Sequence, residues 1–269
     1  MRRILCMIGV VAIPNIALAD ASDIVFANNQ IGLQRVSTNV DYTETGITNS
    51  GSWGTLDTES GYVPGYGLIF SSMTSPRAGG RLHPYFAVQY DRESGLTNYV
   101  GAYIGGGAYG SVVSTSDASL TNLSSRAGLG IELGQKFMIT PYLEYGAHKW
   151  DRYPGYQETY TNNWYGVGAL GQYSPVSRLV LSANLLLGQT LNSHINVPIA
   201  SISASLGNSA YDRFGLSADY AFMRHFHGSI SYEYTSFKYG ESAPNSLGNY
   251  EPDSTTHYQT VRVGVGFAF

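Results

Sequence analysis

The chain has 269 residues and a formal charge of −4, with 13% charged residues, 13% aromatic residues, 22 Tyr and 32 Gly. This balance excludes a nucleic-acid-binding protein, which would be basic, and a disordered chain, which would contain few aromatic residues. A mean hydropathy just below zero also argues against a bundle of membrane-spanning helices.

The first element in chain order is a predicted secretory signal over residues 1–19. Two arginines precede an apolar stretch from Ile4 to Ile13, and Ala17-Leu18-Ala19 provides a cleavage motif of the A-x-A type. A membrane anchor is the alternative, but the apolar stretch is too short to cross about 30 Å of hydrocarbon. The single cysteine, Cys6, lies within the signal. We therefore expect a mature domain over residues 20–269 without a disulfide or a lipid-modified cysteine.

The mature chain alternates apolar residues with small or polar residues, which is the period of a β-strand. In the last segment, every second residue from Val261 to Phe269 is apolar, and the intervening residues include Arg262, Gly264 and Gly266. The same pattern recurs upstream and predicts ten strands. They lie near residues 29–41, 62–73, 82–91, 121–133, 138–151, 159–173, 178–190, 210–223, 228–240 and 256–269.

Two features of these segments favour a membrane barrel over a soluble sandwich. The polar face is rich in Gly, Ser and Ala, whereas a soluble surface would carry many Lys and Glu. Most segments also reach the 9–11 residues that a tilted strand needs to cross a bilayer. Because hydrocarbon cannot satisfy free backbone groups, such a sheet must close on itself. We predict an all-β, transmembrane, antiparallel up-and-down β-barrel of about ten strands.

The predicted connections alternate between short and long, as periplasmic turns and extracellular loops do. The long ones are 42–61, 92–120, 152–158, 191–209 and 241–255. Around residues 92–120 eight or twelve strands are alternatives, because Tyr99 to Tyr109 could form two further strands. The run Gly105-Gly106-Gly107 makes a poor strand interior and favours an extended loop.

Several stretches resemble a group of small proteobacterial outer-membrane β-barrel proteins of the opacity- and porin-like kind. They are Pro141-Tyr142-Leu143-Glu144, Trp150-Asp151-Arg152, Gln172-Tyr173-Ser174-Pro175, Ser236-Phe237-Lys238-Tyr239-Gly240 and Glu251-Pro252-Asp253-Ser254. The resemblance implies this fold and a place in the bacterial outer membrane, and no particular activity. The terminal Val265, Phe267 and Phe269 also look like the signal that the outer-membrane assembly machinery reads, so we expect that machinery as a partner.

Five charged residues share the lumen-facing parity and lie at similar heights on their strands, since each residue rises about 3.3 Å. They are Arg126, Glu144, Asp219, Glu233 and Arg262. Arg126 faces Glu144 on an adjacent strand, and Asp219 faces Glu233 in the same way. We expect a structural network in which the two arginines compensate the three carboxylates. A proton or ion path is the alternative.

Transport and catalysis are the alternatives to a structural role. A diffusion porin is disfavoured because side chains fill so narrow a barrel, although a narrow channel for small solutes remains the second hypothesis. An outer-membrane hydrolase is the third. Asp91, His148, Asp151 and Asp212 are expected at the extracellular rim but do not match the omptin protease pattern, and His227-Gly228-Ser229 has the His-x-Ser spacing of lipid A deacylases at a periplasmic turn. We expect no enzyme.

The remaining motifs predict no metal and no cofactor. His225-Phe226-His227 is read as a solvated turn, and the glycine pattern from Gly105 to Gly110 lacks the strand-to-helix context of a phosphate loop. Trp53, Trp150 and Trp164, together with many of the tyrosines, are expected in the interfacial girdles. The long loops are rich in Tyr, Asn, Ser and Thr, which suits contact with lipopolysaccharide, host surfaces or phage. The leading hypothesis is therefore a structural or surface-interaction role in adhesion or envelope integrity.

Overall fold

The computed structural model describes residues 20–75, 80–102, 107–246 and 248–269, so the predicted signal over residues 1–19 lies outside the described part. A short helix, α1 (Ala21–Ala27), precedes the strands. The barrel strands are β1 (Gln30–Ile47), β2 (Trp53–Met73), β3 (Leu82–Gly101), β4 (Val112–Glu132), β5 (Phe137–Tyr153), β6 (Glu158–Tyr173), β7 (Leu179–Val197), β9 (Ala210–Ala221), β10 (Phe226–Tyr239) and β11 (Asp253–Ala268).

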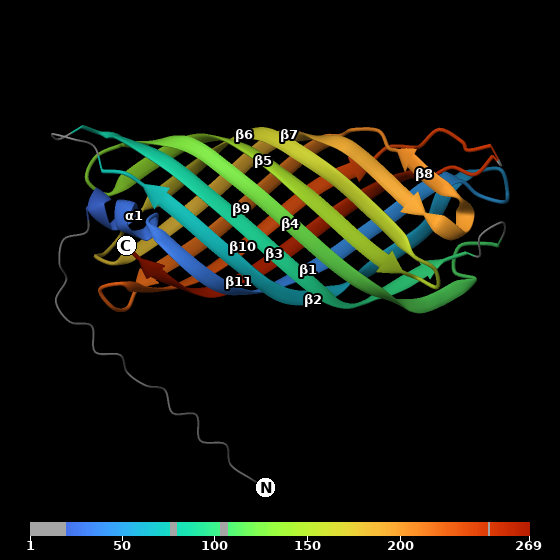
Figure 1. The fold of residues 1–269 in the computed structure, drawn as a ribbon, viewed down its shortest axis with the longest axis horizontal. Helices are drawn as coiled ribbons and strands as arrows, with labels where there is room; N and C mark the ends of the chain where they lie inside the picture. The colour runs from blue at the N-terminus through green and yellow to red at the C-terminus, as the bar shows by residue number, and fades with distance from the viewer. Residues whose placement is uncertain (1–19, 76–79, 103–106, 247) are drawn as a thin grey trace, which may run out of the picture.

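These ten strands form a closed antiparallel barrel (Figure 1). Each pairs with the next along the chain, and β1 also pairs with β11. A single-turn 3-10 helix (Pro198–Ala200) and the short strand β8 (Ile202–Ser205) fold back on the end of β7. Among the described residues, no helix has the length and apolar character needed to cross a bilayer. The predicted ten-stranded, all-β barrel is confirmed.

The barrel wall carries apolar side chains on its outer face, which is the reverse of the arrangement in a soluble protein. Val263 on β11 and Leu216 on β9 are about half exposed, at 53% and 50% of their surface. Two belts of outward aromatic side chains border this apolar zone. Tyrosines, among them Tyr66, Tyr90 and Tyr145, lie toward the extracellular end, and phenylalanines such as Phe70, Phe86, Phe137 and Phe267 lie toward the other end. Aromatic belts of this kind are typical of membrane barrels.

The expectation that tryptophans form the girdles is wrong. Trp150 and Trp164 lie inside the lumen, where they are almost completely buried, and Trp53 begins β2 at the extracellular tip. Small lumen-facing residues make room for such large neighbours. A Cβ on Gly146 would lie 2.1 Å from the Trp164 ring, and one on Gly168 would lie 2.2 Å from the Tyr142 ring. The glycine-rich inner face therefore allows aromatic rings to fill the lumen.

Three of the five expected long loops, 42–61, 92–120 and 191–209, are wrong because most of their residues continue the strands, whereas 152–158 and 241–255 are mainly connections as predicted. β3 and β4 pair without interruption from Leu82 and Ile131 to Gly101 and Val112, so the predicted loop 92–120 is almost entirely a hairpin. β1 and β2 likewise extend to Ile47 and Trp53. Residues 103–106, which include part of the predicted glycine-rich loop, lie outside the described part. The extracellular end is therefore a tall extension of the wall.

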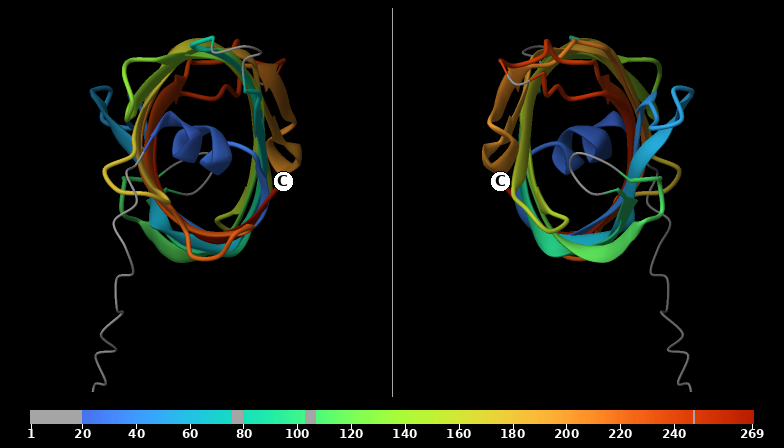
Figure 2. Two further views of the ribbon diagram at one scale, coloured as in Figure 1. Left: turned by 90° about the vertical axis from the view of Figure 1, so that its left-hand side faces the viewer. Right: turned by 90° about the vertical axis from the view of Figure 1, so that its right-hand side faces the viewer.

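Helix α1 lies inside the mouth of the barrel at the end where the chain also terminates (Figure 2). Asp20 caps its N-terminus, and the Asp20 and Asp23 side chains form a reciprocal capping box. Ile24, Val25 and Ala27 are buried against the inner wall. The following Asn28 donates a hydrogen bond to Gln172 Oε1 on β6 at 2.7 Å. Strand periodicity alone gives no sign of this helix, which lies in the periplasmic mouth.

Candidate functional site

The barrel interior is the candidate site, and it is built in layers. Above α1 lies a cavity of about 220 Å³, lined by both polar and apolar side chains from opposite walls. A chain of charged residues crosses the lumen at the level of this cavity. Buried aromatic rings and a second charged cluster fill the extracellular half of the lumen.

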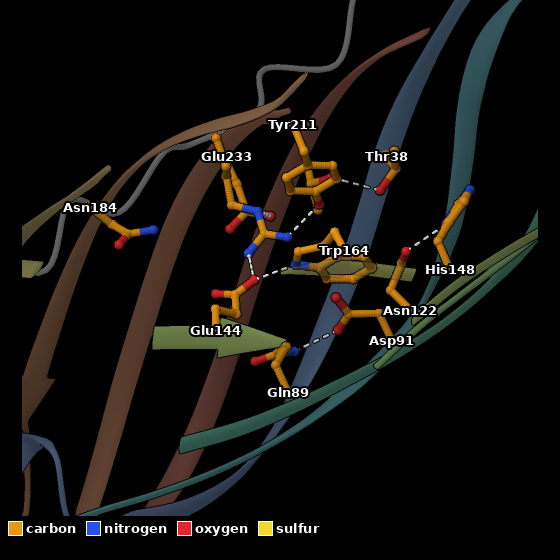
Figure 3. A network of polar contacts seen from close by, with 12 residues as sticks. Thr38, Gln89, Asp91, Asn122, Glu144, His148, Trp164, Asn184, Tyr211 and Glu233 are labelled. Carbon is orange, nitrogen blue, oxygen red and sulfur yellow. Dashed lines mark hydrogen bonds and ion pairs between the residues drawn. The ribbon is translucent and has the colours of Figure 1, made fainter. Parts of the chain in front are cut away.

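The charged chain, here called the central network, consists of Asp91, Arg126, Glu144, Arg213, Glu233 and Arg262. At one end, Glu144 joins two arginines: Arg126 Nε lies 2.5 Å from Glu144 Oε2, and Arg213 Nη1 lies 2.6 Å from Glu144 Oε1. The Trp164 indole donates a third bond to Glu144 Oε1 at 2.7 Å. Figure 3 shows the Glu144 carboxylate pointing at the Trp164 ring. Both oxygens of this fully buried carboxylate are therefore occupied.

The chain continues from Arg213 to the opposite wall. Arg213 Nε lies 3.5 Å from Glu233 Oε1, which in turn lies 3.4 Å from Arg262 Nη2. Arg262 Nη2 then lies 2.8 Å from Asp91 Oδ2. Three arginines thus alternate with three carboxylates, and the six residues come from six different strands. The central network is electrically balanced and ties opposite sides of the barrel together.

The structure brings together four of the five predicted lumen charges: Arg126, Glu144, Glu233 and Arg262. The fifth, Asp219, lies nearer the periplasmic mouth, where it accepts a bond from Gln30 at 3.2 Å and pairs with His227 Nδ1 at 2.5 Å. The sequence analysis missed Arg213, although its parity already indicated the lumen. It also missed Asp91, because the predicted strand ended at that residue and so placed it at the rim.

The second charged cluster, here called the upper cluster, surrounds the fully buried Arg152 near the extracellular end. Arg152 Nη2 lies 3.1 Å from Asp57 Oδ2, Arg152 Nη1 lies 3.4 Å from Glu59 Oε2, and Arg152 Nε binds Glu158. Glu44 lies at 4.0 Å. The guanidinium also lies over the ring of Tyr42, 4.7 Å from its centroid. One cation therefore serves several buried carboxylates.

Glu251, from the connection between β10 and β11, completes the upper cluster. It accepts a hydrogen bond from the Tyr160 hydroxyl, which lies 3.1 Å from the Tyr42 hydroxyl. Burial, reinforced by the nearby negative charge of Glu158, raises the pKa of Glu251 to about 8. Near neutral pH this carboxyl therefore holds a proton, which reduces the negative charge around Arg152.

The rim residues considered for catalysis do not come together. His148 lies inside the lumen, with Nδ1 at 2.7 Å from Asn122 Oδ1 and Nε2 at 3.2 Å from the Tyr258 hydroxyl. Asp151 pairs with Lys149 at 2.8 Å on the outer face, and Asp212 is exposed there. The expectation that Asp91 and His148 lie at the rim is therefore wrong, because the strands continue well beyond both residues.

The periplasmic histidines bind separate partners. His227 pairs with Asp219 and packs against the Phe26 ring of α1 at 4.9 Å, whereas His225 Nδ1 lies 3.1 Å from the Ala268 carbonyl oxygen. Ser229 lines the cavity above them. Within the described ranges, no cluster of three or more His, Cys, Asp or Glu side chains is arranged to hold a metal ion.

The sequence matches no protein-family model and no curated protein. Among solved structures, the outer-membrane protease OmpT from Escherichia coli superposes with a TM-score of 0.52 at 7% identity, over 90% of this chain and 97% of that one. Ail, the attachment invasion locus protein of Yersinia pestis, gives a TM-score of 0.32 at 9% identity, over 90% and 99% of the two chains. OprG from Pseudomonas aeruginosa gives 0.38 at 11% identity, over 90% and 96%. The chain thus has the fold of an outer-membrane β-barrel protein.

Proposed function

We propose that this chain is a bacterial outer-membrane barrel with a closed lumen, and that its role is structural or one of surface interaction. The observation that carries the proposal is the filled interior. The central network crosses the lumen, the upper cluster and its aromatic rings lie above it, and α1 lies below it. A solute passing through would have to separate buried ion pairs, which is costly in a low-dielectric interior.

The outer surface supports the membrane placement. An apolar zone between two aromatic belts covers the periplasmic half of the strands. Val265, Phe267 and Phe269 point outward at the end of β11, where a receptor in the assembly machinery can reach them. We propose that machinery, and the outer-membrane lipid with its lipopolysaccharide, as partners of the chain.

The extracellular tips support a role in surface contact. Large apolar side chains are exposed there, beyond the tyrosine belt: Trp53 is 61% exposed and Val113 74%. Trp53 lies opposite Ile47 across the β1–β2 turn. The neighbouring β3–β4 hairpin is joined to β2 by a 3.0 Å contact between the Tyr109 and Thr58 hydroxyls. Apolar side chains clustered in water typically mark a contact surface. A host-surface or phage ligand is the partner that we propose for these tips.

Single-channel recording in planar bilayers tests the closed lumen. We expect the wild-type protein to insert without stable conductance steps, and regular steps would overturn the proposal. A narrow channel is the second candidate, because the polar cavity reaches α1 and would open to the periplasm if the helix left the mouth. A variant lacking residues 21–27 should stay silent if the central network closes the lumen by itself, whereas conduction by that variant alone would favour a gated channel.

Substitutions at the extracellular tips test the proposed role in surface contact. We expect the double variant Trp53→Ser and Val113→Ser to fold normally and to reduce adhesion of expressing cells or their sensitivity to phage. The matched control is Tyr153→Ser, which removes an apolar side chain of similar exposure (51%) from the β5–β6 side of the rim. No change in adhesion, phage sensitivity or detergent tolerance in the double variant would leave the structural role as the function.

A further inference from the structure

Three cations lie in one row on the outer wall of the barrel. Arg35 on β1 is the register partner of Tyr66 on β2, and Tyr66 is the partner of Arg92 on β3. Arg92 is in turn the partner of Thr121 on β4, which is the partner of Lys149 on β5. All three cationic side chains are exposed. We call Arg35, Arg92 and Lys149 the basic row.

The basic row lies at the extracellular border of the apolar zone. Arg92 follows Tyr90 on the outer face of β3, and Lys149 lies two outward positions beyond Tyr145 on β5. The backbone of Arg35, the sixth residue of β1, lies closer to the periplasmic end of its strand than those of the other two cations. Its guanidinium lies over the Tyr66 ring, 4.8 Å from the centroid. Long basic side chains reach the membrane surface in this way from positions within the apolar zone. The three charged groups therefore lie near the height of the lipid headgroups.

The charge of the row is poorly compensated by the protein itself. Within the described part of the chain, neither Arg35 nor Arg92 has a carboxylate within 4 Å, and Arg92 Nη1 donates to the Thr121 hydroxyl. Only Lys149 has an acidic partner, Asp151. Elsewhere on the described strands, the other arginines face the lumen and Lys238 is the one further outward cation. Apart from Lys238, the outward cations of the described strands are thus confined to the β1–β5 side, and the exposed Asp41 and Asp117 on that side lie nearer the extracellular end of their strands without an ion pair to the row.

We propose that the basic row binds the phosphate groups of a phosphorylated glycolipid in the outer leaflet. Guanidinium groups bind phosphate oxygens with paired, charge-assisted hydrogen bonds. Strands lie about 4.8 Å apart, so cations on alternate strands are spaced by about 10 Å, which suits a headgroup that carries more than one phosphate. Tyr66 of the tyrosine belt lies between Arg35 and Arg92 in the row, and the outward rings of the belt can pack against the upper part of the acyl chains. This inference rests on the membrane placement proposed above.

The test measures lipid retention by the intact barrel. The purified protein is mixed in detergent with lipid A or with enzymatically dephosphorylated lipid A, and bound lipid is counted by native mass spectrometry. We expect at least a tenfold preference for the phosphorylated form. The triple variant Arg35→Gln, Arg92→Gln and Lys149→Gln should lose this preference, whereas the matched control Lys238→Gln, an outward lysine away from the row, should keep it.

Further outcomes separate the alternatives. Equal retention of both lipids by the wild type, or an equal loss in Lys238→Gln, would overturn the inference. Competition by millimolar inorganic phosphate alone would indicate a free-phosphate site, and a dimer that the triple variant abolishes would indicate a second copy on this face; either result would overturn the lipid assignment. Flotation with liposomes tests the membrane placement separately: a protein that inserts but shows no lipid preference contradicts only this inference.

Discussion

The two buried charge clusters of the lumen differ in their balance. In the central network three arginines alternate with three carboxylates, so each inner residue has two partners of opposite sign. In the upper cluster a single arginine serves Asp57, Glu59 and Glu158, with Glu44 and Glu251 close by. The first arrangement shares the electrostatic stabilisation among several cations. The upper cluster depends on one cationic side chain, Arg152, and on the proton that Glu251 holds.

The largest expected effect follows from removing the single cation of the upper cluster. Arg152→Met leaves three buried carboxylates without their counter-charge, and breaking even one buried pair costs about 3–5 kcal/mol. We expect the free energy of unfolding to fall by about 5 kcal/mol or more, measured by urea unfolding in micelles. The exposed Lys238→Met is the control. A loss below about 1 kcal/mol would show that the stability of this cluster does not depend on Arg152.

Removing the shared carboxylate of the central network should cost somewhat less. Glu144→Gln leaves Arg126 and Arg213 close together without their common anion, although Arg213 keeps Glu233. We expect a loss of about 3–5 kcal/mol in the same assay. Glu241→Gln, at an exposed position of the β10–β11 connection, should change nothing. Equal stability of the two variants would contradict the network.

Arg126→Ala should destabilise the barrel less, because Glu144 keeps Arg213 at 2.6 Å and Trp164 at 2.7 Å. We expect about 2 kcal/mol, roughly half the cost of breaking an isolated buried pair. A double-mutant cycle with Glu144→Gln measures the coupling between the two side chains. The control, Arg224→Ala, removes an exposed arginine from a periplasmic turn. Additive effects in the cycle would refute the Arg126–Glu144 pair.

At pH 5 the smallest effect of any of these substitutions is expected at Glu251, and the contribution of this residue shows only as the pH rises. The pKa of Glu251 is about 8 in the folded chain against an ordinary value of 4.5, so the folded state binds this proton more tightly than the unfolded state. Its contribution to stability is therefore complete below about pH 4.5 and is lost as the pH rises toward 8, with a slope of at most about 1.4 kcal/mol per pH unit.

Glu251→Gln should flatten this dependence while leaving stability at pH 5 almost unchanged. Thermal unfolding in detergent between pH 5 and pH 9 measures the slope, and Glu241→Gln should behave like the wild type. If Glu251→Gln retains the full slope, another group in the lumen must bind the proton.

The same comparison explains which part of the site could be predicted. Arg126, Glu144, Glu233 and Arg262 lie within the membrane-spanning half of their strands, where apolar outward residues reveal the parity of every position. The upper cluster lies beyond that zone, where a regular alternation of apolar and polar residues no longer marks the two faces of the wall. In residues 112–120, for example, small and polar residues occupy both parities. Without the alternation, these segments resemble loops, and Asp57, Glu59 and Arg152 gave no signal as lumen residues.

The sequence by itself determined which side chains face outward, since lipid admits apolar groups and the narrow interior needs small or paired polar ones. It also predicted about ten strands, and the continuous pairing of β3 with β4 then excluded the alternatives of eight and twelve. Only the tertiary structure decided which lumen residues meet, because barrel closure staggers each strand against the next and brings Arg213 to Glu144 and Asp91 to Arg262 across the lumen. The position of α1 was decided in the same way, because a seven-residue helix is held by the wall that surrounds it and not by its own propensity.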